Sequence, residues 1–149
     1  MLKRDYQGQN CSIARALELV GDRWTLLIVR DLVFGLSRFD ELLESLGIAT
    51  NVLTDRLNRL VDEGVVERFP YSERPERFAY RLTAKGRELG PVLLALMQWG
   101  DRHISKRAPR IARRRSDRSR VSVALVAADG SPVAPGDLEL VPGPGARAG

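Results

Sequence analysis

A row of polar side chains in the first half of the chain has the spacing of one helix face. Asn51, Thr54, Asp55, Asn58 and Asp62 recur every three or four residues. An Asn amide can pair with the edge of adenine, and Thr can contact a thymine methyl group or a phosphate. One chemistry that suits this face is hydrogen bonding to the base edges of duplex DNA. The alternative is a solvated helix face without a partner. Asp55 and Asp62 favour this alternative because their carboxylates repel phosphate.

Several arginines near this face have a side chain suited to phosphate, because the guanidinium fork can hold an anion with two hydrogen bonds. Arg56 and Arg59 flank the face, and Arg38 precedes it in the chain. Arg74 and Arg77 follow it in a polar loop, where they could straddle a minor groove. The alternatives are a surface salt bridge for Arg38 and an ordinary charged loop for the other pair.

The elements that must position these residues can be predicted from hydrophobic periodicity. Helices are expected over 12–20, 22–33, from Ser37 to about residue 46, and from Thr50 to about residue 63. Asp22 is placed to cap the second of these helices. The third and fourth are joined only by residues 47–49, which is the spacing of a helix-turn-helix.

The pattern changes after Gly64, where two short runs alternate in the manner of strands. Residues 65–69 and 78–82 predict a β-hairpin with a long tip between them. Residues 84–104 predict a long helix, in which Gly90-Pro91 could start or bend a segment. A hairpin directly after the second helix of a helix-turn-helix is a wing. The predicted fold is mainly α with a small β-hairpin (α+β), a winged helix-turn-helix.

The net charge of +5 is not spread along the chain. Residues 1–101 carry a net charge of −1, residues 102–120 carry +8, and residues 121–149 carry −2. We therefore expect a nearly neutral domain over 1–105, a basic linker over 106–120, and a small β-like extension with a flexible end over 121–149. Strand-like runs at 121–127 and 138–141 suggest the extension.

Composition argues against several function classes. The single histidine, His103, has no nucleophile or metal cluster beside it, and no glycine-rich phosphate loop occurs, so we expect no enzyme, no cofactor and no metal site. No apolar run approaches the length that crosses a bilayer, and the N-terminus has no apolar signal stretch. The sequence therefore predicts a cytoplasmic protein without a membrane partner.

The ordered combination of motifs resembles the HxlR-type regulators, a winged-helix branch near the MarR-like proteins. The matching residues occupy most of 11–101: Cys11, GDRWTLLIVR over 21–30, GLSRFDEL over 35–42, LTDRL over 53–57, LVDEGVVER over 60–68, RFAYRLTAKG over 77–86, and Trp99-Gly100. The resemblance implies a homodimer, built from the N-terminal and last long helices. It also implies binding to pseudo-palindromic operators in double-stranded DNA, often with repression of nearby genes.

Residue roles are implied in the same way. The residues expected to face DNA are Arg38, Thr50, Asn51, Thr54, Asp55, Asn58, Arg59, Arg74 and Arg77. The residues expected to build the dimer interface are Ile13, Leu17, Leu89, Leu93, Leu96 and Trp99. Many relatives carry Arg or Lys near the start of the recognition helix, where this chain has Asn51, so its operator sequence does not follow from the resemblance.

Cys11 matches a cysteine that some members of this family use to sense oxidants or electrophiles. A reactive thiolate is favoured by exposure and by nearby positive charge or a helix N-terminus, and Cys11 precedes a predicted helix that carries Arg15. The alternative is a small apolar residue at the dimer contact. Some members of the family respond instead to small molecules. The rival for the whole chain is a winged-helix module that binds proteins without sequence-specific DNA binding.

Overall fold

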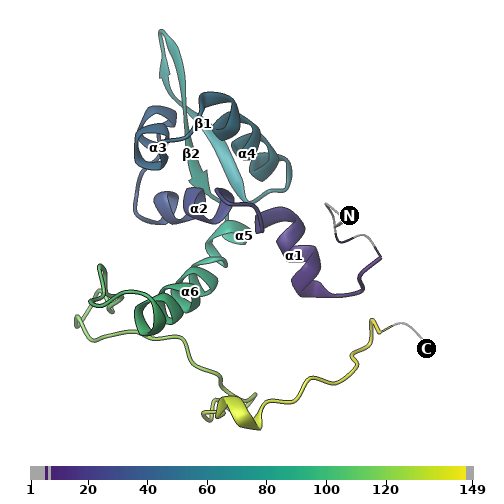
Figure 1. The fold of residues 1–149 in the computed structure, drawn as a ribbon. Helices are drawn as coiled ribbons and strands as arrows, with labels where there is room; N and C mark the ends of the chain where they lie inside the picture. The colour runs from purple at the N-terminus through teal and green to yellow at the C-terminus, as the bar shows by residue number, and fades with distance from the viewer. Residues whose placement is uncertain (1–5, 7, 147–149) are drawn as a thin grey trace. The chain divides into compact units, whose positions relative to one another are not determined.

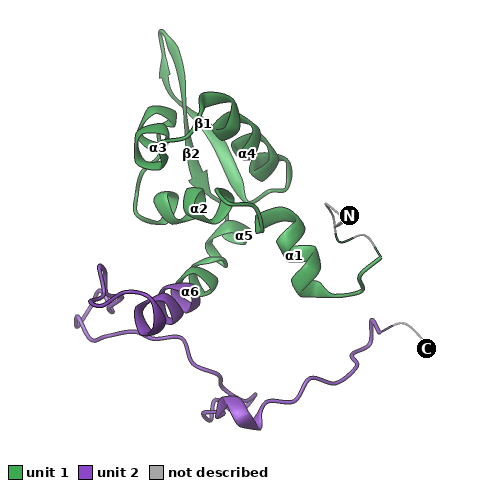
Figure 2. Ribbon diagram, in the orientation of Figure 1, with its two compact units in different colours: residues 1–93 green, residues 94–149 purple. Residues whose placement is uncertain are grey.

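The computed structural model describes residue 6 and residues 8–146, and it divides the chain into two compact units. Unit 1 comprises residues 1–93 and unit 2 comprises residues 94–149 (Figure 2). The division lies within the last long helix, whereas the sequence suggested a boundary near residue 105.

Unit 1 opens with four helices, which are α1 (Ser12–Val20), α2 (Thr25–Val33), α3 (Phe39–Leu46) and α4 (Thr50–Asp62). These agree closely with the helices predicted from periodicity. The N-cap position of α2 is Trp24, two residues later than predicted, but Asp22 still bonds the start of the helix: its Oδ1 accepts hydrogen bonds from the backbone N–H of Trp24 (2.9 Å) and of Thr25 (3.1 Å). The capping interaction leaves residues 22–24 in a turn and starts the helix proper at Thr25.

The turn between α3 and α4 depends on Gly47. Its φ of +64° is left-handed, a conformation that glycine adopts without the Cβ penalty, and its N–H donates to the carbonyl of Leu43 (2.9 Å). This ending closes α3 in a single residue. Ile48 and Ala49 then lead directly into α4, so the sequence folds locally as a helix-turn-helix.

The hairpin consists of β1 (Val66–Glu73) and β2 (Glu76–Leu82), paired antiparallel from Val66↔Leu82 to Glu73↔Glu76. It extends beyond α3 and α4 (Figure 1). The prediction of a long loop over 70–77 was wrong, because pairing continues past a bulge at Tyr71 almost to the tip. Cross-strand hydrogen bonds satisfy the polar backbone groups that a loop would leave to solvent.

Apolar side chains from the helices and the hairpin share one core in unit 1. The buried members are Ile28, Val29, Leu32, Leu42, Leu46, Leu53, Leu57, Leu60, Val65, Val66 and Leu82. Leu53, Leu57 and Leu60 are at most 1% exposed, which confirms the predicted inward face of α4. The opposite face of α4 must therefore point to solvent.

The predicted helix over 84–104 is two helices, α5 (Ala84–Arg87) and α6 (Gly90–His103). Pro91 explains the interruption, because it lacks the N–H that a continuous helix would use and is tolerated only in a first turn. In unit 2, the runs at 121–127 and 138–141 do not form strands within the described residues. The first run carries one isolated bridge, from Val126 to Pro132, and a short 3₁₀ helix, Pro135–Asp137, lies between the two runs.

Candidate nucleic-acid interface

The exposed face of α4 carries the polar residues that the sequence singled out. Thr50, Asn51, Thr54, Asp55 and Asn58 are all exposed. The Thr54 hydroxyl donates to the carbonyl of Thr50 (2.9 Å), so it can offer a partner only its oxygen lone pairs and its methyl group. The two Asn amides, by contrast, have both donors and an acceptor to present.

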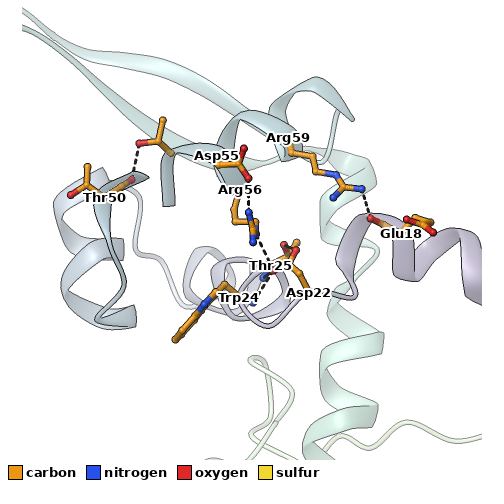
Figure 3. Close-up of polar contacts among 9 residues, drawn as sticks. Glu18, Asp22, Trp24, Thr25, Thr50, Asp55, Arg56 and Arg59 are labelled. Atoms are coloured by element: carbon orange, nitrogen blue, oxygen red, sulfur yellow. Dashed lines mark hydrogen bonds and ion pairs between the residues drawn. The ribbon is translucent and has the colours of Figure 1, made fainter. Parts of the chain in front are cut away.

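Asp55 does not stand alone on this face, because it forms an ion pair with Arg56. The same guanidinium also pairs with Asp22, with Nε 3.2 Å from Oδ1 (Figure 3). Arg56 therefore links α4 to the start of α2 and lies between two carboxylates. The sequence placed Arg56 beside the polar face but had no signal for this link, because it joins residues far apart in the chain.

Arg59 is held against α1, where its guanidinium donates to the backbone carbonyl of Glu18 (Figure 3). This hydrogen bond uses one of the five N–H donors of the guanidinium and orients the group toward α1, while the other donors remain available to a phosphate. The family resemblance implied a DNA contact for Arg59, and the sequence carries no signal for this hydrogen bond, which depends on how α1 packs near α4.

The pKa of Asp22 reflects its position between these helices. Burial raises the pKa of Asp22. Hydrogen bonds from the Thr25 hydroxyl, from the backbone N–H groups of Trp24 and Thr25, and from Arg56 lower it by more than burial raises it, so the pKa lies below its ordinary value of 3.8. A carboxyl with a depressed pKa stabilises the fold above its unfolded pKa and loses that contribution as the pH falls through the folded pKa.

We therefore expect Asp22→Asn to lower stability at neutral pH and to matter progressively less as the pH falls below about 4. Asn preserves a good helix cap, so the substitution isolates the charge. Urea midpoints across an acid pH series measure the effect. Asp62→Asn serves as the control, since Asp62 is exposed on α4. A wild-type advantage that is constant with pH would contradict the assignment.

The hairpin presents arginines in two different ways. Arg68 lies over the ring of Phe78 at 4.3 Å, and Arg81 lies over Phe69 at 4.4 Å. Arg74 and Arg77, at the tip, are exposed, and no ion pair or side-chain hydrogen bond joins them to another residue that the structure describes. The wing therefore ends in two available guanidinium groups.

Arg38 is attached to the base of this wing. Its backbone bridges to Ala79, the neighbouring Ser37 accepts from the N–H of Tyr80 (2.8 Å), and its guanidinium lies 4.6 Å from the ring centre of Tyr71. The alternative interpretation, a salt bridge from Arg38 to a neighbouring carboxylate, is not found among the described residues. The segment before α3 is thus tied to β2 by an isolated bridge, for which the sequence carries no signal.

A model of the HxlR-like helix-turn-helix family matches residues 19–108. The chain belongs to this family. The matched residues include α2, the whole helix-turn-helix, the wing and α6, so the HxlR-like assignment covers the interface just described. They do not include Cys11 or residues 109–149.

Known proteins support the HxlR-like assignment. The chain is 49% identical over 105 residues to Rv3095 of Mycobacterium tuberculosis, an uncharacterized HTH-type transcriptional regulator, covering 70% of this chain and 65% of that protein. It thus spans somewhat less than two thirds of that relative's length. Its structure is similar to PA1607, described as a proposed transcription factor, with a TM-score of 0.78, 40% identity, and coverage of 90% of this chain and 96% of that one.

A third relative, the redox regulator HypR in its oxidized form, has a TM-score of 0.59 and 29% identity, covering 64% of this chain and 99% of that one. The fold is a winged helix-turn-helix, and matched relatives such as Rv3095 are named transcription regulators of the HTH type. Among the described residues, no helix is long and apolar enough to cross a membrane.

The residues assigned to a dimer interface differ in exposure. Ile13 and Leu17 on α1 are 68% and 41% exposed, and Leu96 and Trp99 on α6 are 53% and 54% exposed. Leu89 and Leu93 are half-buried and pack against the core of unit 1. Cys11 is half-buried at the N-terminal cap of α1, and Arg15 donates to the side chain of Asn10 (2.9 Å).

Proposed function

We propose that this HxlR-like chain is a sequence-specific cytoplasmic repressor that binds a pseudo-palindromic operator as a homodimer. The observation that carries the proposal is the exposed polar face of α4, which lies opposite three buried leucines and is followed by a wing with two available arginines. A helix fits the major groove, where base edges are distinguishable. In this proposal α4 reads bases and the wing binds phosphates.

Footprinting on the intergenic DNA beside the gene tests this function. A protected segment with two related half-sites, whose centres are about 34 Å or a multiple apart, is the expected result. No protection on that DNA, together with no enrichment of any sequence from a random duplex pool, would favour the rival function, a winged helix that binds protein.

The contributions of α4 and the wing should separate in binding measurements. We expect Asn51→Ala or Asn58→Ala to cost roughly 1–3 kcal/mol on the cognate operator and to relax one base position, because a lost bidentate pair removes discrimination. Arg74→Ala or Arg77→Ala should weaken all sequences alike and reduce the salt slope by about one unit. Titrations on operator and scrambled duplexes measure both quantities. Wing substitutions that change base preference would contradict this division.

We also propose that Cys11 is the site of a redox or electrophile signal. Its place at the cap of α1, a helix with exposed apolar residues, supports the proposal, as does the similarity to a redox regulator. An adduct, or a disulfide between the two copies of Cys11, would rotate one winged domain relative to the other and spoil the spacing of the recognition helices. A small-molecule effector is the alternative signal.

The single cysteine makes this proposal easy to test. Diamide or a quinone is expected to abolish operator binding by the wild type and to leave Cys11→Ser bound, because no other thiol can react. A gel shift with and without oxidant measures the difference, and a reductant added afterwards should restore wild-type binding if a disulfide forms. Equal responses of the two proteins, or none, would assign Cys11 a structural role.

A further inference from the structure

Residues 113–120, here called the arginine loop, form a closed turn within unit 2. The N–H of Val121 donates to the carbonyl of Ala112 (3.0 Å) at the base of the loop, and the N–H of Arg114 donates to the carbonyl of Ser119 (2.7 Å) inside it. The loop therefore has a defined backbone shape.

Four arginines of the loop point their charge at solvent. Arg113, Arg115, Arg118 and Arg120 are all exposed. Among the described residues, none of their guanidinium groups has a hydrogen bond or ion pair to another side chain. A protein gains no internal stability from four like charges so close together, because they repel one another.

The one carboxylate of the loop is occupied. Asp117 accepts from the Ser119 hydroxyl (2.7 Å), from the Ser119 N–H (3.0 Å) and from the Arg114 guanidinium (3.0 Å). The hydrogen bonds from Ser119 are the main reason that the pKa of Asp117 lies below its ordinary value. Asp117 thus shapes the loop and balances Arg114, and it leaves the other four charges without a counterion.

The net charge of the chain is concentrated in the unit that contains the arginine loop. Residues 1–93 have no net charge, whereas residues 94–149 carry the whole net charge of +5. The unit with the helix-turn-helix therefore contributes little long-range attraction to DNA, and the electrostatic attraction must come largely from unit 2.

We propose that the arginine loop is a second DNA-binding site, which contacts the phosphates of duplex DNA without regard to sequence. The proposal goes beyond operator recognition, because it requires only duplex phosphates. Arginine is the residue type that binds phosphate oxygens in a bidentate manner. Within unit 2, Gln98 on α6 bonds both backbone groups of Val123, so the chain that follows the loop is fastened to the last helix.

Other partners fit the loop less well. Protein interfaces are centred on aromatic or large apolar anchors, and residues 113–120 include none. Single-stranded nucleic acid is held by stacking on aromatic rings, and residues 100–149 contain no Phe, Trp or Tyr. Binding to the phosphates of a duplex requires only positive charge and bidentate guanidinium groups, which the loop supplies.

The expected effect is a change in salt dependence. Four phosphate contacts contribute about 3 to 4 units of slope in log K against log salt for each chain. Between about 50 and 200 mM salt, the wild type should therefore lose on the order of 100-fold more affinity per chain than a variant without these charges.

The test compares the wild type with a variant in which Arg113, Arg115, Arg118 and Arg120 are all replaced by Gln, on a random-sequence duplex across a salt series. We expect the Gln variant to bind the duplex more weakly than the wild type and to show a smaller slope of log K against log salt. A second variant, in which all four arginines are replaced by Lys, should keep most of that slope. Unchanged thermal unfolding of both variants shows that the substitutions leave the fold intact.

An unchanged salt slope in the Gln variant would overturn the proposal. The proposal would also fail if the Gln variant lost binding to poly-glutamate but bound the duplex as the wild type does, because the loop would then be a site for an acidic protein. The random duplex keeps this result separate from the proposed function. If neither the wild type nor Asn51→Ala binds an operator more tightly than a random duplex, the operator proposal fails. The salt series on the random duplex still decides the role of the loop.

Discussion

Gly86→Ala is expected to destabilise the protein by about 3 kcal/mol or more, which is the upper range for overpacking a closed core. Gly86 is buried in α5, and a Cβ at this position would lie 2.1 Å from the carbonyl oxygen of Val65 and 3.0 Å from a methyl carbon of Leu82. Since the nearest atom belongs to the backbone, no side-chain rotation relieves the contact. Urea unfolding measures the loss.

Gly90→Ala is the matched control, because nothing lies within 4 Å of a Cβ built there. Gly90 is the first residue of α6, where Ala should be neutral or stabilise by less than about 1 kcal/mol. If Gly86→Ala were as stable as Gly90→Ala, the close packing of α5 against the start of the hairpin would be wrong.

Leu96→Glu is expected to convert a dimer into a monomer and to lower operator affinity by about 10²- to 10⁴-fold. Leu96 is 53% exposed on α6, near the equally exposed Trp99, and exposed apolar patches of this kind mark interfaces. A charge buried at the dimer contact has no partner, so association becomes unfavourable. The operator then loses the gain from engaging two half-sites together.

Sedimentation and operator titration measure the two effects on the same preparations. Val33→Glu is the control, because Val33 is 49% exposed on α2 and is not assigned to the interface. It should remain a dimer with wild-type affinity. A wild type that sediments as a monomer at micromolar concentration would contradict the homodimer, and so would a monomeric Leu96→Glu with full operator affinity.

Local patterns in the sequence determined most of unit 1. The positions of helices α1 to α4 follow from apolar spacing, and in α3 and α4 the apolar stripe also specifies which residues face inward. In α1 the stripe does not do so, because Ile13 and Leu17 are exposed in the single chain. Asp22 could be assigned as a cap, and Gly47 as a turn, because both act on backbone groups only a few residues away. The exposed polar face of α4 could be inferred as the face opposite the buried side chains of Leu53, Leu57 and Leu60.

Contacts between distant segments needed the tertiary structure. Pairing of β1 with β2 continued through residues whose composition is typical of a loop, because a strand is stabilised by its partner and not by its own propensity. For the same reason the strand-like run at 138–141 forms no strand in the described part of unit 2, where no second strand lies alongside it.

The charged groups show the same limit most clearly. Arg56 and Arg59 are adjacent on α4 to residues that face solvent, and their type and spacing suit phosphate, yet Arg56 joins Asp22 and Arg59 joins the carbonyl of Glu18. The sequence determined which guanidinium groups lie near the polar face. Only the packing of α1 and α2 beside α4 decided which of them are occupied within the protein, because a long charged side chain takes the nearest partner that the fold provides.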